Sequence, residues 1–593
     1  MKNITLFICL NGVLCFCNAT SSSFKWSKSY TLKAVLTVPA ANLSEPYQVW
    51  LDGDTRKSRV DFYDGMDKLY RLWDDAEEKY FYYKIHPETT GNFRNKDVCH
   101  EVSADASETK TYAINTYLPV KKFKYSHNEI VNSIKAQKWI YEYSVTLEQK
   151  SVKIVYAVWV TFDNASPSKT ATPVRYVYEM KLGDKLLDNF QHDYIYFDGN
   201  KPEVSLLQKP LGLPCGALRY TSFHEPIDPL VEFIEPLLES SRVTKAFDGF
   251  KTKHNKKYAD ENEHFKRMNI FRDNLRFINS LNRQHKSFSV GVNHLTDLND
   301  EEISVFLGTK HTKTHDEPDE GSGGYNNDDD DDEGDDFEGA DKSTFDWRDY
   351  GAITPVKDQT ALCGACYAFT SAAVIESTAY IARGCKNLDE ISVQAVVDCT
   401  WASPENKNQG NLGCSGGSYE YTLKWVSKWG VPLASEYGPY LAQEGRCHYK
   451  NMTKLVVIDG YSELQKKKHI IKKYIKTIGP VLAAIDSNLK SFTFYTGGIY
   501  NDPRCRTEGD FRNHGVILVG YGKEEDQEYW IVKNSFGVAW GEDGYMRIAT
   551  KDNVCGVKNF PVGVNFVKNR IENCKSRGEF KPENVNDQNW LYF

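Results

Sequence analysis

The first third of the chain alternates apolar and polar residues with a period of two. The alternation is clearest over residues 152–160 and 174–182, where valine, isoleucine, tyrosine, methionine and leucine recur at every second position. A β-strand with one buried face requires that period. Asp-Gly pairs, which favour tight turns, lie between such runs at residues 52–53, 64–65 and 198–199. The pattern predicts an antiparallel β-rich domain, a sheet or half-barrel, over residues 20–225.

Cysteines and aromatic residues add one expectation for this β-rich region. Cys99 and Cys215 are its only cysteines, which predicts a disulfide between them. No group of its residues has the pattern of a catalytic site. The tyrosines and tryptophans are expected to pack in the core and across strands.

After about residue 240 the period becomes that of an α-helix. Six residues recur at spacings of four, four, three, four and four, which keeps them within about 100° on one helix face. They are Glu263, Arg267, Phe271, Asn274, Ile278 and Asn282. Their spacing and types resemble the ERFNIN signature of papain-family propeptides. Gly291-Val-Asn293-His-Leu295-Thr-Asp297 resembles the second propeptide motif, with Leu295 where Phe is usual. The resemblance implies a cathepsin L-like inhibitory propeptide over residues 240–308.

An acidic segment follows, over residues 309–341. Residues 316–341 hold 14 acidic residues and no Lys or Arg, so the chain, with a net charge of −8, carries +6 outside them. Such a block repels itself and buries no core, which predicts a disordered, protease-accessible linker. A cation site is disfavoured because no spaced pattern of carboxylates surrounds one ion.

Length and composition exclude a small disulfide-dependent peptide and a wholly disordered chain. The 593 residues predict several domains, and 36 Tyr, 30 Phe and 12 Trp supply ample buriable surface. Residues 1–19 combine Lys2, an apolar run and small residues, which predicts a secretory signal peptide. No other stretch approaches the length of a membrane-spanning helix.

The cysteine count fits an oxidising compartment. Of 14 cysteines, three lie in the signal segment, and the odd remainder of 11 predicts one free thiol. Sequons predict glycosylation at Asn42, Asn164 and Asn451, although Pro167 disfavours the second.

The best candidate for the free thiol is Cys366. Cys363-Gly-Ala-Cys366-Tyr367 matches the local signature of papain-like cysteine proteases. The run that follows favours a helix, whose N-terminus would lower the thiol pKa. A plain disulfide role for Cys366 is the alternative, and the odd cysteine count disfavours it.

A base and an orienting residue are expected far along the chain. Asn513-His514-Gly515 precedes an apolar strand and resembles the histidine block of the family, 148 residues after Cys366. Asn534, after a second strand, resembles the asparagine block and would orient the His514 ring. Phe536 and Tyr367 stand where Trp is commoner, and both keep an apolar ring.

The resemblance also implies an oxyanion hole formed by the Cys366 N–H and the Gln359 amide. The chain departs from the family here, because one extra residue separates Gln359 from Cys363. The loop must therefore bulge or the amide must be displaced.

Substrate is expected to pair with the backbone at Gly416 and Gly417, since adjacent glycines allow a peptide to approach closely. A plain turn would also explain these two glycines. The resemblance implies further contacts at the second specificity pocket and beside the histidine, from Ser418, Tyr419, Ala484, Phe560 and Asn513. No adjacent His pair lies between Cys366 and His514, which favours an endopeptidase over a dipeptidase-like relative.

The remaining cysteines pair by resemblance as Cys363–Cys414, Cys399–Cys447 and Cys505–Cys555. Cys385 and Cys574 are left over, and a bond between them would tie the tail, residues 568–593, to the domain. Sequence alone does not fix this connectivity.

Together these features predict an α+β protein. A two-lobed papain-like peptidase domain over residues 342–567, with a helical and a β-barrel-like lobe, follows the β domain, propeptide and linker. The expected activity is that of a secreted or lysosomal cysteine endopeptidase made as a zymogen. It would need no cofactor or metal, and would bind protein substrates and its own propeptide but no nucleic acid. The layout also resembles the insect 26/29-kDa-type proteinases. The alternative is a catalytically impaired papain-fold protein that binds partners through its β domain.

Overall fold

The computed structural model describes residues 24–88, 96–105, 116–147, 150–162, 170–217, 228–234, 236–284, 286–308, 344–401, 410–449, 452–453, 455–507 and 513–566. The expected signal peptide, acidic linker and C-terminal tail lie outside these residues, as do Asn164, Asn451 and Cys574. The chain divides into two compact units. The first comprises Met1–Lys84, Glu101–Gly212 and Pro226–Glu239, and the second contains the rest.

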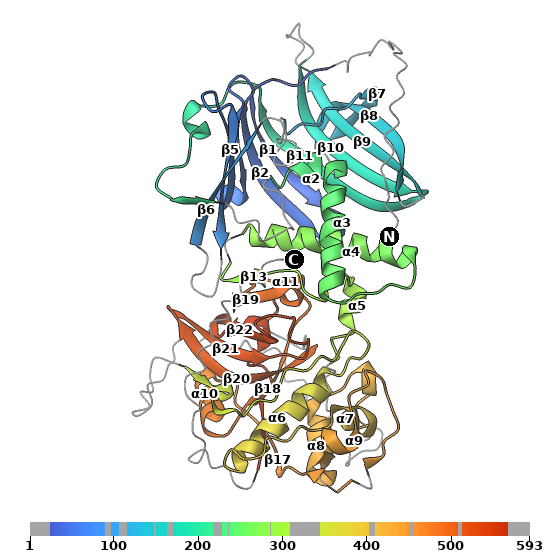
Figure 1. The fold of residues 1–593 in the computed structure, drawn as a ribbon, viewed down its shortest axis with the longest axis vertical. Helices are drawn as coiled ribbons and strands as arrows, with labels where there is room; N and C mark the ends of the chain where they lie inside the picture. The colour runs from blue at the N-terminus through green and yellow to red at the C-terminus, as the bar shows by residue number, and fades with distance from the viewer. Residues whose placement is uncertain are drawn as a thin grey trace. The chain divides into compact units, whose positions relative to one another are not determined.

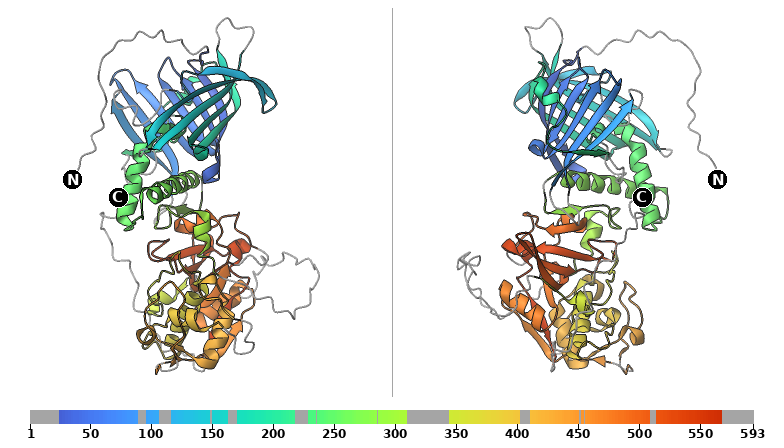
Figure 2. Two further views of the ribbon diagram at one scale, coloured as in Figure 1. Left: turned by 90° about the vertical axis from the view of Figure 1, so that its right-hand side faces the viewer. Right: turned by 60° about the vertical axis from the view of Figure 1, so that its left-hand side comes forward.

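A twelve-stranded antiparallel sheet forms the N-terminal region and curls into an open half-barrel (Figure 1, Figure 2). Its spatial order is β12-β6-β5-β4-β3-β2-β1-β11-β10-β9-β8-β7. The strands are β1 (Tyr30–Val38), β2 (Leu43–Asp52), β3 (Lys57–Phe62), β4 (Asp67–Asp74), β5 (Lys79–Glu88), β6 (Lys96–Asp105), β7 (Lys124–Val131), β8 (Ile134–Leu147), β9 (Lys150–Phe162), β10 (Ala171–Leu182), β11 (Lys185–Asp198) and β12 (Cys215–Ala217).

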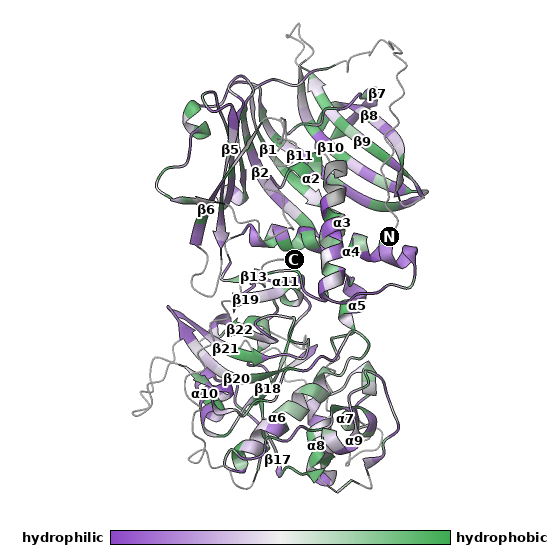
Figure 3. Ribbon diagram, in the orientation of Figure 1, coloured by the Kyte–Doolittle hydropathy of each residue, from purple (hydrophilic) through white to green (hydrophobic). Residues whose placement is uncertain are grey.

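The alternating residues of β9 and β10 bury one face, as the sequence predicts. In β9 the residues at 152, 154, 156, 158 and 160 are all buried. Figure 3 shows polar and apolar positions interleaved along these strands. Most of the buried large side chains are aromatic, among them Tyr156, Tyr176 and Tyr178. A short helix, α2 (Val231–Ile234), packs against the sheet through its Phe233 ring, 5.3 Å from the ring of Phe190.

The predicted helical propeptide follows. It consists of α3 (Pro236–Lys253), α4 (Glu261–Asn282), strand β13 (Phe288–Val290) and α5 (Asp300–Ser304). Helix α4 begins after Asp260, whose carboxylate accepts hydrogen bonds from the Asn262 and Glu263 N–H groups. Phe247 and Phe250 of α3 pack on Phe271 and Leu275 of α4, which forms the small core of this segment.

The C-terminal region has the two expected lobes. One contains helices α6 (Cys366–Ala382), α7 (Val393–Cys399), α8 (Tyr419–Trp429) and α9 (Ala434–Tyr437). The other contains α10 (Lys468–Thr477), α11 (Lys490–Thr493) and strands β17 (Gly460–Glu463), β18 (Val481–Ile485), β19 (Tyr495–Tyr500), β20 (His514–Glu524), β21 (Gln527–Lys533), β22 (Tyr545–Ala549) and β23 (Val562–Asn565). Strand β14 (Phe345–Asp346) pairs with β20, and β15 (Val431–Pro432) pairs with β16 (Leu455–Val456).

The propeptide extends the sheet of the second lobe. Strand β13 pairs antiparallel with β19 at one end of the order β13-β19-β22-β21-β20-β18-β23-β17. In the helical lobe, α6 is apolar on every side, and all of its residues except Ala382 are buried. A helix of this kind belongs in the centre of a domain, and α6 packs between the other helices and β20.

Four disulfides lie in the described part of the chain. They are Cys99–Cys215, Cys363–Cys414, Cys399–Cys447 and Cys505–Cys555, the pairs expected from the sequence and the resemblance. Because Cys574 is outside the described residues, its pairing with Cys385 stays a prediction. Within those residues, no helix is long and apolar enough to cross a membrane.

Candidate active site

Cys366 is the free cysteine of the described residues, and it is fully buried. It is the first residue of α6, and the preceding Ala365 offers no side-chain cap to the helix. The N–H groups of a first helical turn and the helix dipole favour a negative charge there. The position therefore suits a thiolate, as expected from the sequence.

His514 and Asn534 form a hydrogen-bonded pair. His514 begins β20, Asn534 directly follows β21, and the two strands are neighbours in the sheet. The distance from His514 Nε2 to Asn534 Oδ1 is 2.7 Å. Asn534 Oδ1 also accepts the Ser535 N–H at 2.8 Å, which fixes the amide orientation. Since Oδ1 only accepts, Nε2 carries the proton of the neutral His514 ring, and Nδ1 is free to take another.

An aromatic side chain covers this pair, as the sequence predicts for position 536. The ring of Phe536 lies 4.7 Å from the ring of His514 and 5.6 Å from Trp540. Phe536 is 3% exposed. It keeps water from the His514–Asn534 hydrogen bond, which is stronger in a low-dielectric site.

Gln359 lies between the cysteine loop and the asparagine loop. Its Oε1 accepts the Ser535 hydroxyl at 2.7 Å, and its Nε2 lies 3.3 Å from the Cys363 carbonyl oxygen. Its backbone carbonyl accepts the Tyr440 hydroxyl at 3.0 Å. These bonds join Gln359 to the loop before Cys366 and to Ser535, the residue after Asn534.

The extra residue after Gln359 is accommodated by a bulge. Thr360 adopts a left-handed conformation with φ of 62°, which is uncommon for a residue other than glycine. Leu362 projects outward and is 76% exposed, whereas Gln359 is fully buried. Of the two outcomes expected from the sequence, the loop bulges and the amide stays at the site.

The end of the propeptide occupies the groove beside these residues. The Gln359 amide donates to the Phe306 carbonyl at 3.2 Å, and the Gly417 N–H donates to the Gly308 carbonyl at 2.8 Å. A Cβ atom added to Gly308 would lie 1.8 Å from the Gly364 carbonyl oxygen. Only glycine fits there. The propeptide therefore engages the two donors that the sequence assigns to substrate.

The signature residues of the propeptide make its main polar contacts. Asn274 donates to the carbonyls of Thr296 and Leu298, and Arg267 pairs with Glu263 and Glu302. Two of these residues also contact the peptidase domain: Asn274 Oδ1 accepts from Lys490 Nζ at 3.2 Å, and the Asn293 amide of the second motif donates to the Thr493 carbonyl at 2.9 Å. The helical signature thus serves internal bonds and one direct contact.

Two half-buried histidines also belong to this propeptide. Burial lowers the pKa of His254 and of His294 to about 4, and the neighbouring Lys256 acts in the same direction on both. His294 Nε2 lies 3.8 Å from Asp358 Oδ2, in the loop that carries Gln359. Asp297, the expected acidic member of the second motif, is paired with Lys256 at 2.8 Å.

The residues expected to bind substrate side chains lie in the domain core or make hydrogen bonds of their own. Tyr419 and Ala484 are 3% and 1% exposed and belong to the domain core. The Ser418 hydroxyl caps α8, and Asn513 Oδ1 accepts from Ser487. The Tyr419 hydroxyl donates to the Phe560 carbonyl at 3.0 Å, which brings those two residues together.

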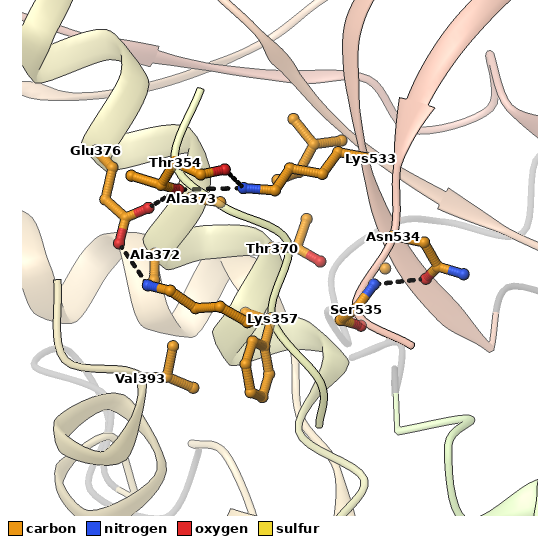
Figure 4. A pocket seen from close by; sticks show the side chains of 13 residues that line it. Thr354, Lys357, Thr370, Ala372, Ala373, Glu376, Val393, Lys533, Asn534 and Ser535 are labelled. Carbon is orange, nitrogen blue, oxygen red and sulfur yellow. Dashed lines mark hydrogen bonds and ion pairs between the residues drawn. The ribbon is translucent and has the colours of Figure 1, made fainter. Parts of the chain in front are cut away.

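Behind the site, a buried polar cluster joins the two lobes (Figure 4). Lys533 Nζ donates to the Thr354 carbonyl at 2.6 Å, and the Thr354 hydroxyl donates to Glu376 at 2.6 Å. Lys357 also pairs with Glu376, at 3.1 Å. Burial lowers the pKa of Lys533 to about 8. Sequence reasoning missed this cluster, although Glu376 within an apolar helix was a visible signal.

Nothing in the described residues points to a metal, since no group of three or more His, Cys, Asp or Glu side chains there could hold an ion.

Comparison with known proteins identifies two segments. Residues 342–564 match the family described as papain family cysteine protease, and residues 247–303 match the cathepsin propeptide inhibitor domain. Similar proteins include digestive cysteine proteinase 1 of Homarus americanus, 32% identical over 54% of this chain and 94% of that protein. Cathepsin S of Mus musculus is 32% identical over 55% of this chain and 92% of that protein. The probable cysteine protease RD21B of Arabidopsis thaliana is 34% identical over 52% of this chain, which covers 63% of its length.

Proposed function

The chain belongs to the papain family of cysteine proteases and carries a cathepsin-type propeptide, and we propose that it is the zymogen of a cysteine endopeptidase that uses Cys366, His514, Asn534 and Gln359. The observation that supports the proposal is the 2.7 Å bond between His514 and an Asn534 amide fixed by Ser535, together with Cys366 at the start of α6, outside the disulfides of the described residues.

The chemistry follows from these positions. His514 Nδ1 takes the proton of the Cys366 thiol, and the thiolate sulfur attacks the carbonyl carbon of the scissile peptide bond. The Gln359 amide and the Cys366 N–H donate to the oxyanion. His514 then gives its proton to the leaving amine, and an acyl-enzyme remains. Water, activated by His514, hydrolyses that thioester and restores the thiol.

Asn534 keeps the His514 ring in the tautomer that these reaction steps require. It accepts from Nε2 without adding a charge, so the ring can both take and return a proton at Nδ1. Phe536 protects that bond from water, as Trp would in many relatives.

The propeptide inhibits by occupying the groove. Its Phe306 and Gly308 carbonyls bind the donors of Gln359 and Gly417, so a substrate has no access to them. Release of the enzyme needs a cut within the acidic linker, residues 309–341, and withdrawal of this segment. We place maturation in the secretory route, in an endolysosomal or extracellular setting, with Asn42, exposed at the turn before β2, as a glycosylation site.

The alternative, an impaired papain-fold binding protein, depends on displacement of the Gln359 amide. The hydrogen bonds of that amide to the Phe306 carbonyl and the Ser535 hydroxyl favour the catalytic proposal instead.

Hydrolysis of an unfolded protein by the activated chain tests the proposal. We expect Cys366→Ser to abolish hydrolysis and Asn534→Ala to lower kcat by about 10²-fold or more. Leu362→Ala, on the exposed bulge, is the matched control and should retain activity. Full activity in Cys366→Ser, or no activity in the unsubstituted protein after complete propeptide removal, would contradict the proposal.

A further inference from the structure

The concave side of the N-terminal sheet holds a short piece of chain that precedes the propeptide. This concave face, the bowl, is lined by Tyr47, Tyr176, Phe190, His192 and Tyr194. The piece is residues 228–234, which end in α2 and continue directly into α3 of the propeptide (Figure 1). No residue of the catalytic machinery lies in it.

Apolar side chains supply most of the contact. Leu230, Val231, Phe233 and Ile234 are each less than 5% exposed. The Phe233 ring meets the Phe190 ring edge to face at 5.3 Å. Four neighbouring buried apolar side chains resemble the core of a stable interface more than a linker, which normally runs over the surface.

Polar groups fix the position of the segment. His192, fully buried, lies with Nε2 3.2 Å from the Phe233 carbonyl oxygen and with Nδ1 2.7 Å from the Tyr47 hydroxyl. Nε2 therefore donates to Phe233, and the Tyr47 hydroxyl donates to Nδ1. One bowl residue thus binds the backbone of the docked segment, and a second holds that residue in the needed tautomer.

A local hydrogen bond fixes the start of the segment. Asp228 is fully buried, and its Oδ1 accepts the Leu230 N–H at 3.1 Å. Lys84, Arg71 and the Tyr117 hydroxyl offset part of the cost of burying this carboxyl group, and burial remains the larger effect. The segment is therefore fitted to the bowl by shape and by hydrogen bonds.

We propose that the bowl is a docking site for residues 228–234 and keeps them bound after processing, so that the β domain retains the propeptide when the enzyme is released. The proposal assigns the β domain a role as a holder of the inhibitor. It rests on the proposed function only for the purpose of the propeptide, since the docking itself needs no catalysis.

Two cuts of the chain, one on each side of the propeptide, show what the proposal implies. A cut in the acidic linker separates the enzyme from the propeptide and leaves α2 joined to α3. A second cut within residues 218–227, upstream of Asp228, breaks the covalent link between β domain and propeptide. The bowl would then hold the two together without a covalent bond.

The test uses the full chain with Cys366→Ser, which prevents self-cleavage, so its result is independent of catalysis by Cys366. A site for a sequence-specific protease is placed in residues 218–227 and another in residues 309–341, with an affinity tag on the β domain. After both cuts, we expect the purified propeptide fragment to stay with the tagged β domain. Phe233→Ala should weaken this retention roughly 30-fold.

Ile130→Ala is the matched control, because it removes the same kind of apolar contact from a side chain 75% exposed on β7. It should leave retention unchanged. Loss of the propeptide fragment from the unsubstituted β domain, or equal retention in Phe233→Ala, would overturn the proposal.

Hydrogen exchange in the cut, unsubstituted protein gives a second measurement that does not depend on the folding of a variant. We expect the amides of residues 230–234 to remain protected after the cut at 218–227. Protection lost on that cut would show that the chain connection alone kept the segment in the bowl, and the proposal would fail.

Discussion

The chain leading to the active site is bound at two places by different kinds of contact. In the bowl, residues 228–234 bury four apolar side chains, and the Phe233 ring packs on the ring of Phe190. On the peptidase domain, residues 282–308 are bound through backbone carbonyls, a short strand pairing and buried amides. The buried rings of Phe288 and Phe306 add apolar contacts, 4.7 Å from Tyr500 and 4.8 Å from Phe536. The first anchorage is therefore mainly apolar, whereas the second combines apolar rings with backbone and amide hydrogen bonds.

The two anchorages also differ in how their buried groups titrate. In the bowl, burial raises the pKa of Asp228 to about 6 and lowers the pKa of His192 to about 4. In the propeptide, burial lowers the pKa of both His254 and His294 to about 4. The bowl therefore contains two shifts of opposite sign, and the propeptide contains two of the same sign.

The sign of each shift gives the pH dependence. A histidine with a lowered pKa contributes full stability above about 6.5, and the stability is lost as the pH falls towards 4. The raised pKa of Asp228 costs stability above about 6, and that cost is removed as the pH falls towards 3.8. Acid therefore loosens the propeptide from within, whereas the effects of Asp228 and His192 on the bowl oppose each other. Acid acts on one carboxylate of the propeptide as well: burial tends to raise the pKa of Glu302, but the hydrogen bonds from Arg267 and Asn299 lower it overall, so this contribution is also lost in acid.

The largest expected effect comes from filling the close approach at Gly308. Gly308→Ala would place a Cβ atom 1.8 Å from the Gly364 carbonyl oxygen, and overpacking of this kind costs about 2 kcal/mol. We expect the uncut zymogen to expose its site roughly 30-fold more often. The rate of thiol labelling at neutral pH measures this exposure.

Gly249→Ala in α3 is the control for that change, because an added Cβ there meets no atom within 4 Å. It should leave the labelling rate unchanged. Equal rates for the two variants would mean that Gly308 does not seal the groove.

The next effect concerns acid release from the peptidase domain. Replacing His254 and His294 together by Gln removes the two side chains whose charged form is disfavoured by burial. We expect the midpoint of pH-triggered activation to move down by about one unit, read from the rate of processing across pH 4–7. The control His127→Gln, on the exposed surface of β7, should leave the midpoint unchanged. An unchanged midpoint in the double variant would contradict the assigned role of the two histidines.

A third effect concerns the balance within the bowl. Asp228→Asn keeps an acceptor for the Leu230 N–H and removes the buried charge, so it should stabilise the first unit by about 2 kcal/mol at pH 7. The stability of this variant should then fall as the pH falls, because the protonation of His192 is no longer offset by the protonation of Asp228. Thermal unfolding at pH 7 and pH 5 measures both, with Asp184→Asn in the exposed turn after β10 as control. If the stability of Asp228→Asn did not change between pH 7 and pH 5, the opposing effects assigned to Asp228 and His192 would be contradicted.

The peptidase half was largely predictable because its chemistry lies in local motifs. Cys366 at a helix start and Asn534 after a strand are visible as short patterns, and the period of 3.6 gave the helix that became α4. The fate of the bulge after Gln359 was not predictable, since it depends on Ser535 and Tyr440, which are distant in sequence. The bowl was missed for the same reason, because His192 and Phe233 meet only through long-range packing.

The most direct test of the central claim is labelling of Cys366 by an epoxide directed at active-site thiols. The account predicts slow labelling of the uncut zymogen, fast labelling of Cys366 alone after propeptide removal, and a marked loss of rate in His514→Ala. Failure of Cys366 to react in an intact, propeptide-free protein, or a rate independent of His514, would contradict it.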